Sequence, residues 1–348
     1  MANIRTGIAA LATVAALALG ACSTPADADP ADTQAPAEET TAAEETTAAE
    51  ETGAAEAGTV EIEDNNGTLT VTVPPTSVVA LDNRTFETLA DWGVELSAAA
   101  RSLMPSTNPY VDDETIPDIG SHREPNLELI VAAEPDLVIN GQRFSQYFDD
   151  IATLAPDAVQ VNLDPRDGEP FDTELKRQIT VLGQIFGKEA EAEALTGEFD
   201  ASIEAVKAAY TEGETVMAVN VSGGNIGYIA PGLGRAIGPL FDIFGFTPAL
   251  QVEGASDDHQ GDDISVEAIA DSNPDWILVM DRDAAVSADD AEYVPAAQVI
   301  EESAALQNVT AVKEGNIIYM PADTYTNEGI QTYTEFLNAF AAALEAAA

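Results

Sequence analysis

Positive charge is scarce in this chain of 348 residues. It has 13 lysines and arginines against 62 aspartates and glutamates, so its formal net charge at pH 7 is −49. A chain this acidic repels nucleic acid and the anionic surface of a membrane, which excludes both as partners of the folded chain. Because cations are few, the positions at which they occur are informative.

Histidine and cysteine are rarer still. The two histidines are His122 and His259, and the single cysteine is Cys22. One cysteine allows no intramolecular disulfide, and two histidines are too few for a histidine-rich zinc or manganese site. The sequence also lacks a Gly-x-Ser-x-Gly motif and a phosphate-binding loop ending in Gly-Lys-Ser/Thr. A secreted enzyme is therefore the least favoured interpretation.

The N-terminus carries a short apolar run, residues 8–19, preceded by Arg5, and the run ends in the segment Leu19-Gly-Ala-Cys22. The run is too short to span a bilayer comfortably, and the pattern predicts a signal peptide over residues 1–21. The residues before Cys22 resemble the lipobox of bacterial lipoproteins. That resemblance implies cleavage before Cys22, a diacylglyceryl group on its sulfur, and a lipid anchor on the extracytoplasmic face of the cell membrane. A plain secretory signal with an incidental cysteine is the alternative.

The composition then changes twice along the chain. Residues 22–58 are rich in Ala, Glu, Thr and Pro, which form no hydrophobic core and repel one another by charge, so they predict a disordered acidic tether. The remaining length suits one large domain or two lobes. We expect an N-terminal lobe over residues 59–170, a connecting helix over 171–212 and a C-terminal lobe over 213–348.

Two stretches of the folded part carry the same pattern. Residues 126–143 and residues 265–282 each have an apolar stripe at helical spacing, a Pro-Asp pair, an apolar run of strand length and a final arginine. The arginines are Arg143 and Arg282. Helices that alternate with short strands predict a parallel α/β sheet, and ligands bind such sheets beyond the carboxyl ends of the strands. The duplication therefore predicts two similar lobes that each offer one arginine to a shared cleft. Alternatively, each arginine pairs with a nearby acid such as Asp281 or Asp283.

Other segments predict the rest of the α/β organisation. An Asn66-Gly67 turn between alternating residues predicts a hairpin, and a stretch of some forty residues without a strand pattern predicts a helical connector. The predicted elements are a hairpin over Val60–Val73, strands over Val78–Leu81, Asp157–Leu163, Val216–Val221 and Ile317–Met320, and helices over Thr85–Trp92, Phe171–Tyr210 and Gln331–Ala347.

These features together resemble a known family, the ferric-siderophore substrate-binding lipoproteins of ATP-binding-cassette importers, and within it the branch for catecholates of the petrobactin and enterobactin type. The resemblance covers the folded part from about Val78 to Phe340. It implies a class III periplasmic-binding-protein-like fold, with two Rossmann-like lobes joined by a single long helix, and a monomer without an intrinsic cofactor. The matching segments are residues 118–128, 135–143, 182–189, 241–249, 264–267, 273–282 and 317–319.

The family resemblance also implies a ligand and the residues that bind it. A ferric tris-catecholate complex is a trianion, and guanidinium groups suit it because they stay charged when desolvated and can bind two adjacent oxygens. The implied ligand-binding residues are Arg143, Arg235 and Arg282, where Arg235 lies in a glycine-rich loop. His259 and Tyr325 match positions that can ligate Fe(III) when a tetradentate siderophore leaves two coordination positions open. Hexadentate and tetradentate complexes are both compatible with this set.

The same resemblance implies a partner, the permease of the importer. Glu124 resembles a surface glutamate that forms a salt bridge with the permease, and Glu253 is the candidate for its counterpart in the second lobe. On a surface this acidic, an ordinary solvated glutamate is the alternative at both positions. For the ligand, a hydroxamate siderophore, haem or cobalamin bound by the same fold is the alternative to a catecholate.

Overall fold

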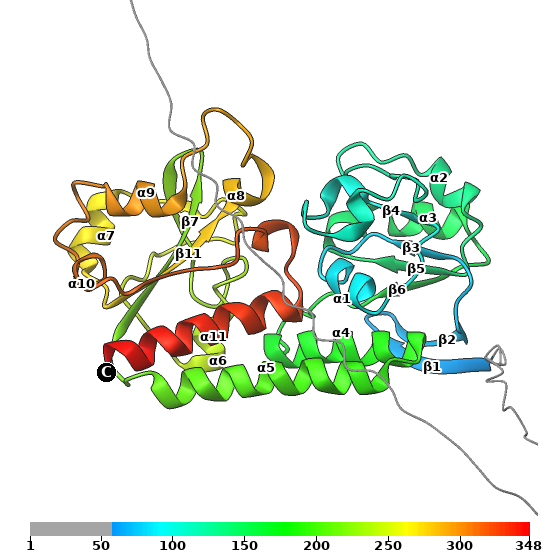
Figure 1. Cartoon of the computed structure of the whole chain (residues 1–348), viewed down its shortest axis with the longest axis horizontal. Helices are drawn as coiled ribbons and strands as arrows, with labels where there is room; N and C mark the ends of the chain where they lie inside the picture. The colour runs from blue at the N-terminus through cyan, green and yellow to red at the C-terminus, as the bar shows by residue number, and fades with distance from the viewer. Residues whose placement is uncertain (1–57) are drawn as a thin grey trace, which may run out of the picture. The chain divides into compact units, whose positions relative to one another are not determined.

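Two β-sheets organise residues 58–348, the part of the chain that the computed structural model describes. The predicted signal peptide, Cys22 and nearly all of the predicted tether lie outside the described residues. We call the residues around the first sheet the N-terminal half and those around the second sheet the C-terminal half (Figure 1).

The sheet of the N-terminal half is parallel throughout, in the order β4-β3-β5-β6. Its central strands β3 and β5 consist of buried residues, as expected for strands covered on both faces. A separate hairpin of β1 and β2 precedes it, as the sequence predicts, but its two-residue turn is Asn65-Asn66, one position before the expected Asn66-Gly67. The elements are β1 (Gly58–Asp64), β2 (Gly67–Val73), β3 (Val78–Ala80), α1 (Phe86–Asp91), β4 (Ala98–Ala99), η1 (Arg101–Leu103), η2 (Pro109–Val111), α2 (Glu128–Ala132), β5 (Leu137–Asn140), η3 (Gln142–Tyr147), α3 (Phe148–Leu154) and β6 (Val159–Asn162).

The sheet of the C-terminal half is mixed, in the order β10-β8-β7-β11-β12, with β9 paired to β7. Strands β7, β11 and β12 are parallel, whereas β8 runs antiparallel to β7. The sequence analysis did not predict β8, which stands between β7 and the glycine-rich loop. The elements are β7 (Thr215–Ser222), β8 (Asn225–Tyr228), α6 (Leu240–Phe244), β9 (Thr247–Pro248), β10 (Asp262–Asp263), α7 (Val266–Ser272), β11 (Trp276–Asp281), α8 (Arg282–Val286), α9 (Ala296–Glu301), α10 (Thr310–Glu314), β12 (Ile317–Tyr319) and η4 (Thr324–Thr326).

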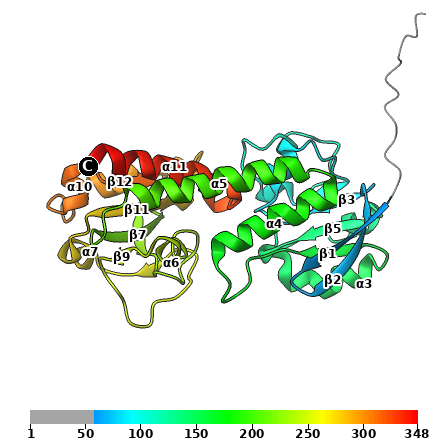
Figure 2. The same ribbon diagram turned by 90° about the horizontal axis from the view of Figure 1, so that it is seen from below.

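Three long helices connect and support the two halves. The predicted connector is helical as expected but is divided into α4 (Phe171–Phe186) and α5 (Glu189–Ala209), because the chain turns at Gly187 with a left-handed φ of 63° that glycine adopts without strain. Helix α5 packs against α4 and against α11 (Ile330–Ala347), and it passes beside both halves (Figures 1 and 2). At 1.5 Å per residue its length is about 30 Å, enough for one helix to connect the halves.

The described residues fall in one compact unit, so the lobe boundaries expected near residues 170 and 212 stay a prediction. The α/β fold class with two similar halves is confirmed. No helix among residues 58–348 is both long enough and apolar enough to cross a bilayer.

The duplicated stretches fold alike down to the backbone. In each, a short helix (α2 or α7) is followed by a non-glycine residue with positive φ directly before the Pro-Asp pair, Glu134 at 45° and Asn273 at 44°. The Pro-Asp aspartate that follows caps the start of the neighbouring strand. Asp136 accepts hydrogen bonds from the backbone N (2.7 Å) and hydroxyl (2.6 Å) of Thr76, and Asp275 accepts the same pair from Thr215 at 2.7 and 2.8 Å. These bonds tie each helix–strand unit to the strand before it.

Candidate functional site

A cavity of about 820 Å³ lies between the two halves and is strongly cationic. Four of the 13 basic residues of the chain line it, and no aspartate or glutamate does so within the described residues. This lining contrasts with a net charge of −49 for the whole chain. The basic residues are Arg123, Arg143, Arg235 and Arg282, and both histidines, His122 and His259, line the same space. The cavity is within the size range of small-molecule sites.

Tyr325 brings the three predicted arginines together. Its ring is nearly buried, at 6% exposure, and the guanidinium carbons of Arg143, Arg235 and Arg282 lie 5.2, 4.3 and 4.9 Å from the ring centre. These distances are those of cation–π contacts, in which the electron-rich face of the ring attracts the cation. The structure therefore brings together the three arginines that the sequence predicted, which we call the arginine cage.

Arg143 is the cage member without a carboxylate partner. It lies in η3, directly after β5, and its Nη2 donates a hydrogen bond of 2.9 Å to the backbone O of Tyr325. No carboxylate lies within 4.0 Å of its guanidinium among residues 58–348. Burial, and then the nearby charge of Arg235, lower the pKa of Arg143. An anion that enters the cavity would relieve both unfavourable effects.

Arg235 is fixed from behind by a buried carboxylate. Both Nε and Nη2 of Arg235 contact Oε1 of Glu328, whose side chain is only 1% exposed. The loop before Arg235 is tight: a Cβ on Gly234 would lie 2.5 Å from Cγ2 of Ile229 and 2.7 Å from the backbone N of Ala230. Glycine at position 234 thus lets the loop fold close enough to direct Arg235 toward the cavity.

Arg282 is partly neutralised. Its Nη1 donates to Oδ1 of Asp283 at 3.2 Å and to the hydroxyl of Ser222 at 3.3 Å. The alternative interpretation of this arginine, pairing with a neighbouring acid, is thus correct for Asp283. Asp281 instead caps α8 by accepting from the N of Ala284 at 3.0 Å. Arg282 still lines the cavity, so the ion pair and the cage position coexist.

A buried charge network behind the cage was not predicted. Glu328 also accepts from Nη2 of Arg84 at 3.1 Å, and Arg84 in turn contacts Asp164 at 3.3 Å. Burial would raise the pKa of Glu328, but Arg235, Arg84 and Arg143 outweigh it and lower that pKa. Burial, and then the charge of Asp164, raise the pKa of Asp82 to about 7. The network joins the N-terminal half, through Arg84, to the segment that carries Tyr325.

The two predicted iron ligands are close to each other. The rings of His259 and Tyr325 have centres 6.5 Å apart, and both residues line the cavity. The side chain of His259 is 50% exposed, and its backbone O accepts a hydrogen bond of 3.1 Å from Nδ2 of Asn220. His259 is therefore held by its backbone while its imidazole is at the surface of the cavity.

The predicted permease contacts lie outside the cavity. Glu124 and Glu253 are both exposed, in loops of different halves, and neither lines the cationic cavity. The duplication also places a matched pair of exposed acids, Glu128 and Glu267, in the first turns of α2 and α7. The two glutamates occupy equivalent positions of the duplicated stretches, so the repeat in the sequence was sufficient to predict this pair.

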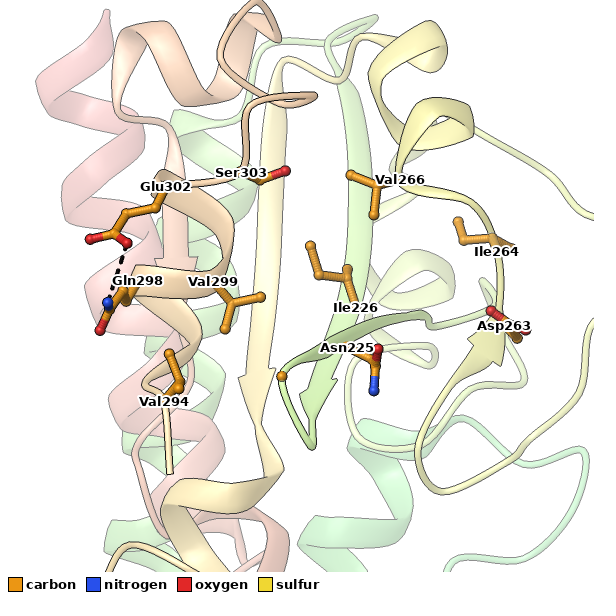
Figure 3. A pocket seen from close by; sticks show the side chains of 11 residues that line it. Asn225, Ile226, Asp263, Ile264, Val266, Val294, Gln298, Val299, Glu302 and Ser303 are labelled. Atoms are coloured by element: carbon orange, nitrogen blue, oxygen red, sulfur yellow. Dashed lines mark hydrogen bonds between the residues drawn. The ribbon is translucent and has the colours of Figure 1, made fainter. Parts of the chain in front are cut away.

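A second pocket, of about 480 Å³, lies in the C-terminal half between β8, β10 and α9 (Figure 3). Its walls are apolar residues such as Ile226 and Val299, and its polar groups include Asp263 and Glu302, the latter accepting from Nε2 of Gln298 at 3.2 Å. No lysine or arginine lines it. Of these two cavities, only the first offers basic side chains to an anion.

Comparison with known proteins agrees with this architecture. The model of a family described as "Periplasmic binding protein" matches residues 78–324. The chain belongs to the periplasmic binding protein family. Members of this family are binding proteins. The family match covers both sheets and the arginine cage.

Relatives within the family are named for iron chelates. The chain is 28% identical to the petrobactin-binding protein YclQ of Bacillus subtilis (79% of this chain, 84% of the relative). It is 29% identical to the ferric-anguibactin-binding protein FatB of Vibrio anguillarum (76% and 81%). Among solved structures, the periplasmic catecholate-siderophore binding protein VctP of Vibrio cholerae superposes with a TM-score of 0.71 at 25% identity, covering 82% of this chain and all of VctP.

Proposed function

We propose that this chain captures a ferric catecholate siderophore in the cavity between its halves and delivers it to an ATP-binding-cassette importer. The observation that carries the proposal is the arginine cage, three guanidinium groups around one buried tyrosine in a cavity that no described carboxylate lines. The names of YclQ and VctP, which refer to petrobactin and to catecholate siderophores, support the same ligand class.

The chemistry of the ligand fits the cage. Three catecholates around Fe(III) leave a charge of about −3 spread over six oxygens, and arginine stays charged when water is removed from around it. Guanidinium groups bind neighbouring oxygens in pairs through charge-assisted hydrogen bonds. No described aspartate or glutamate lines the cavity, so the ligand would be the anion that meets the exposed side of the cage.

His259 and Tyr325 support binding of tetradentate complexes as well. A tetradentate siderophore leaves two positions of Fe(III) open, and imidazole nitrogen and phenolate oxygen both suit iron. The iron would arrive with the siderophore as cargo. Among the described residues, no group of three or more His, Cys, Asp or Glu side chains is placed to hold a metal ion by itself. We propose that His259 turns toward Tyr325 to complete the coordination of such a complex.

For delivery, we propose a lipid anchor at Cys22 and acidic contacts to the permease from both halves. Glu124 and Glu253 are the predicted contacts, and the matched pair Glu128 and Glu267 is a second set that the duplication supports. Charge-reversing each pair in turn and measuring siderophore-dependent iron uptake would separate them, since substrate binding by the purified protein should not change.

A fluorescence-quenching titration tests the ligand. We expect the purified protein to bind a ferric catecholate with submicromolar affinity, and Arg143→Ala to weaken that binding at least tenfold, a loss of about 1.4 kcal/mol or more. Ferric hydroxamate, haem and cobalamin would be titrated alongside. Tight binding of one of these instead, unaffected by Arg143→Ala, would contradict the catecholate assignment while keeping the carrier role.

A further inference from the structure

Arg123 is a fourth arginine of the cavity, outside the cage. It is exposed, it lines the same cavity as the cage, and among residues 58–348 no carboxylate lies within 4.0 Å of its guanidinium. An arginine with this position in an acidic protein has a charge available to a ligand. The alternative is that Arg123 is an ordinary solvated loop residue that does not contribute to ligand binding.

The loop that carries Arg123 is attached to the turn that carries Arg143. The backbone O of His122 accepts hydrogen bonds from Nε2 of Gln146 at 3.1 Å and from the hydroxyl of Tyr147 at 3.0 Å, and both donors belong to η3. The backbone N of Arg123 donates to Oγ of Ser121 at 3.3 Å. The Cα of Arg123 is therefore fixed relative to Arg143, while its long side chain remains free to reach into the cavity.

The charges around the cage show why a further cation matters. Four buried or half-buried arginines form the cage and the network behind it, and four carboxylates lie among them: Arg84, Arg143, Arg235 and Arg282, with Asp82, Asp164, Glu328 and Asp283. Within the cage, Arg235 and Arg282 are each paired with a carboxylate, Glu328 and Asp283, and Arg143 alone has no carboxylate partner among the described residues. A multiply charged anion gains more from an arginine whose charge is not already compensated.

We propose that Arg123 is a further ligand-binding residue, which contacts the anionic chelate at the mouth of the cavity and makes the site prefer ligands of higher charge. This proposal rests on the proposed function. Arg123 is exposed, so its contribution depends on ligand charge and ionic strength, and the buried cage supplies the contacts that salt screens less. Replacing Arg123 should lower the association rate and the salt dependence of binding.

Binding kinetics with two ligands of different charge test the proposal. The probes are a ferric tris-catecholate (charge −3) and a ferric complex of a tetradentate bis-catecholate (charge −1), each mixed with the wild-type protein, Arg123→Gln and Lys313→Gln. Lys313 is exposed on α10 and does not line the cavity, so Lys313→Gln removes the same charge elsewhere. We expect Arg123→Gln to weaken binding of the trianion about 5- to 10-fold, mainly through the association rate, and of the monoanion less than about 3-fold, with Lys313→Gln close to wild type.

The outcomes separate this proposal from the proposed function. If the wild type binds the trianion but Arg123→Gln behaves like Lys313→Gln, or weakens both ligands equally, Arg123 has no role in charge preference. If the wild type binds neither complex, the proposed function itself is wrong.

A measurement without ligand tests whether the charge of Arg123 acts on His122, which lines the cavity. Burial, and then the charges of Arg143, Arg123 and Arg235, lower the pKa of His122. With only two histidines in the chain, the imidazole signals in an NMR titration can be assigned with one His122→Gln variant. We expect Arg123→Gln to raise the pKa of His122 and Lys313→Gln to leave it unchanged. An unchanged pKa in Arg123→Gln would overturn the placement of this charge.

Discussion

The two duplicated stretches give their arginines the same backbone position but different electrostatic surroundings. Arg143 and Arg282 both follow the strand that a capped Pro-Asp aspartate begins, and both lie within about 5 Å of the ring centre of Tyr325. Arg143 bonds only a backbone carbonyl, whereas Arg282 contacts Asp283 and Ser222. The two repeats therefore place their arginines alike relative to Tyr325, but only the arginine of the second repeat has a carboxylate partner among the described residues.

The residue after each arginine explains this divergence. Phe144, which follows Arg143, is fully buried in the hydrophobic core, whereas Asp283, which follows Arg282, is turned toward its neighbour's guanidinium. The position after the arginine therefore supplies a carboxylate partner in the second repeat and an apolar core residue in the first. Arg143 should be the dominant anion-binding group, and Arg282 a weaker one that is held in place by its own acid.

The largest expected effect is the loss of ligand affinity in Arg143→Ala, which should exceed the loss in Arg282→Ala. Arg143→Ala should cost about 2–5 kcal/mol in binding a ferric tris-catecholate, because it removes an uncompensated and largely buried charge. Arg282→Ala should cost less, because Asp283 already neutralises part of the charge of Arg282. Fluorescence-quenching titrations of both variants beside Lys313→Ala measure the difference. Equal losses for the two arginines would show that Asp283 does not reduce the contribution of Arg282.

The aspartate caps should contribute to stability in both halves. Asp136 accepts three hydrogen bonds, two from Thr76 and one of 3.0 Å from the N of Ser77, and Asp275 accepts two from Thr215. Hydrogen bonds to a charged group are worth about 1.5–3 kcal/mol, so Asp136→Ala and Asp275→Ala should each lower the free energy of unfolding by about that amount. Urea denaturation measures it, with the exposed Asp271→Ala as the control. Losses no larger than that of the control would mean that the caps are not stabilising.

The two halves also differ in how their stability depends on pH. Asp82 follows β3, and apolar Val221 occupies the matching place in β7. Burial, and then Asp164, raise the pKa of Asp82 to about 7, above the value of about 3.9 expected in the unfolded chain. The folded state therefore binds a proton that the unfolded state has lost, and this stabilisation is present below pH 4 and disappears as the pH rises through 7.

Asp82→Asn should remove that pH dependence. Asparagine has the shape of aspartate but no charge. Nε2 of Gln178 donates to Asp82, and Oε1 of Gln178 has no hydrogen-bond partner among the described residues. After a flip of the Gln178 amide, this Oε1 can accept from the NH₂ group of the new asparagine. From pH 5 to pH 8 the stability of the variant relative to wild type should increase on the order of 1–2 kcal/mol. Chemical denaturation at both pH values gives this number. Parallel pH profiles for the two proteins would contradict a raised pKa of Asp82.

Local patterns in the sequence were sufficient for the repeated elements and for the arginines at their ends. The hairpin over β1 and β2, the Pro-Asp turns and the positions of Arg143 and Arg282 all follow from short-range spacing. Arg235 and Tyr325 came from the family resemblance, and the structure places both in the cavity. The roles of His259, Tyr325, Glu124 and Glu253 stay predictions.

Long-range charge pairing could not be predicted from the sequence. Arg84 and Glu328 are 244 positions apart, and nothing in the sequence distinguishes Glu328 from the other carboxylates of a chain with 62 of them. Strand β8 was missed because its four residues include a glycine and an asparagine, which are uncommon in strands. Arg123 was not predicted, because the family resemblance implies three arginines and the sequence does not show that a fourth lines the same cavity.

The smallest expected effect is a gain in ligand affinity when Asp283, the acid beside Arg282, loses its charge. Asp283→Asn removes the negative charge beside Arg282 but keeps an oxygen that can accept from the backbone N of Gly223, as Asp283 does. Because a like-signed charge near an anionic ligand is repulsive and Asp283 is partly exposed, we expect a several-fold gain in affinity for the trianion, less than about 1 kcal/mol. Asp271→Asn, an exposed acid on α7, controls for the change in net charge. A gain confined to Asp283→Asn would show that one aspartate reduces the anion affinity of the C-terminal half. No gain, with Arg282→Ala as costly as Arg143→Ala, would mean that both arginines contribute their full charge despite the ion pair.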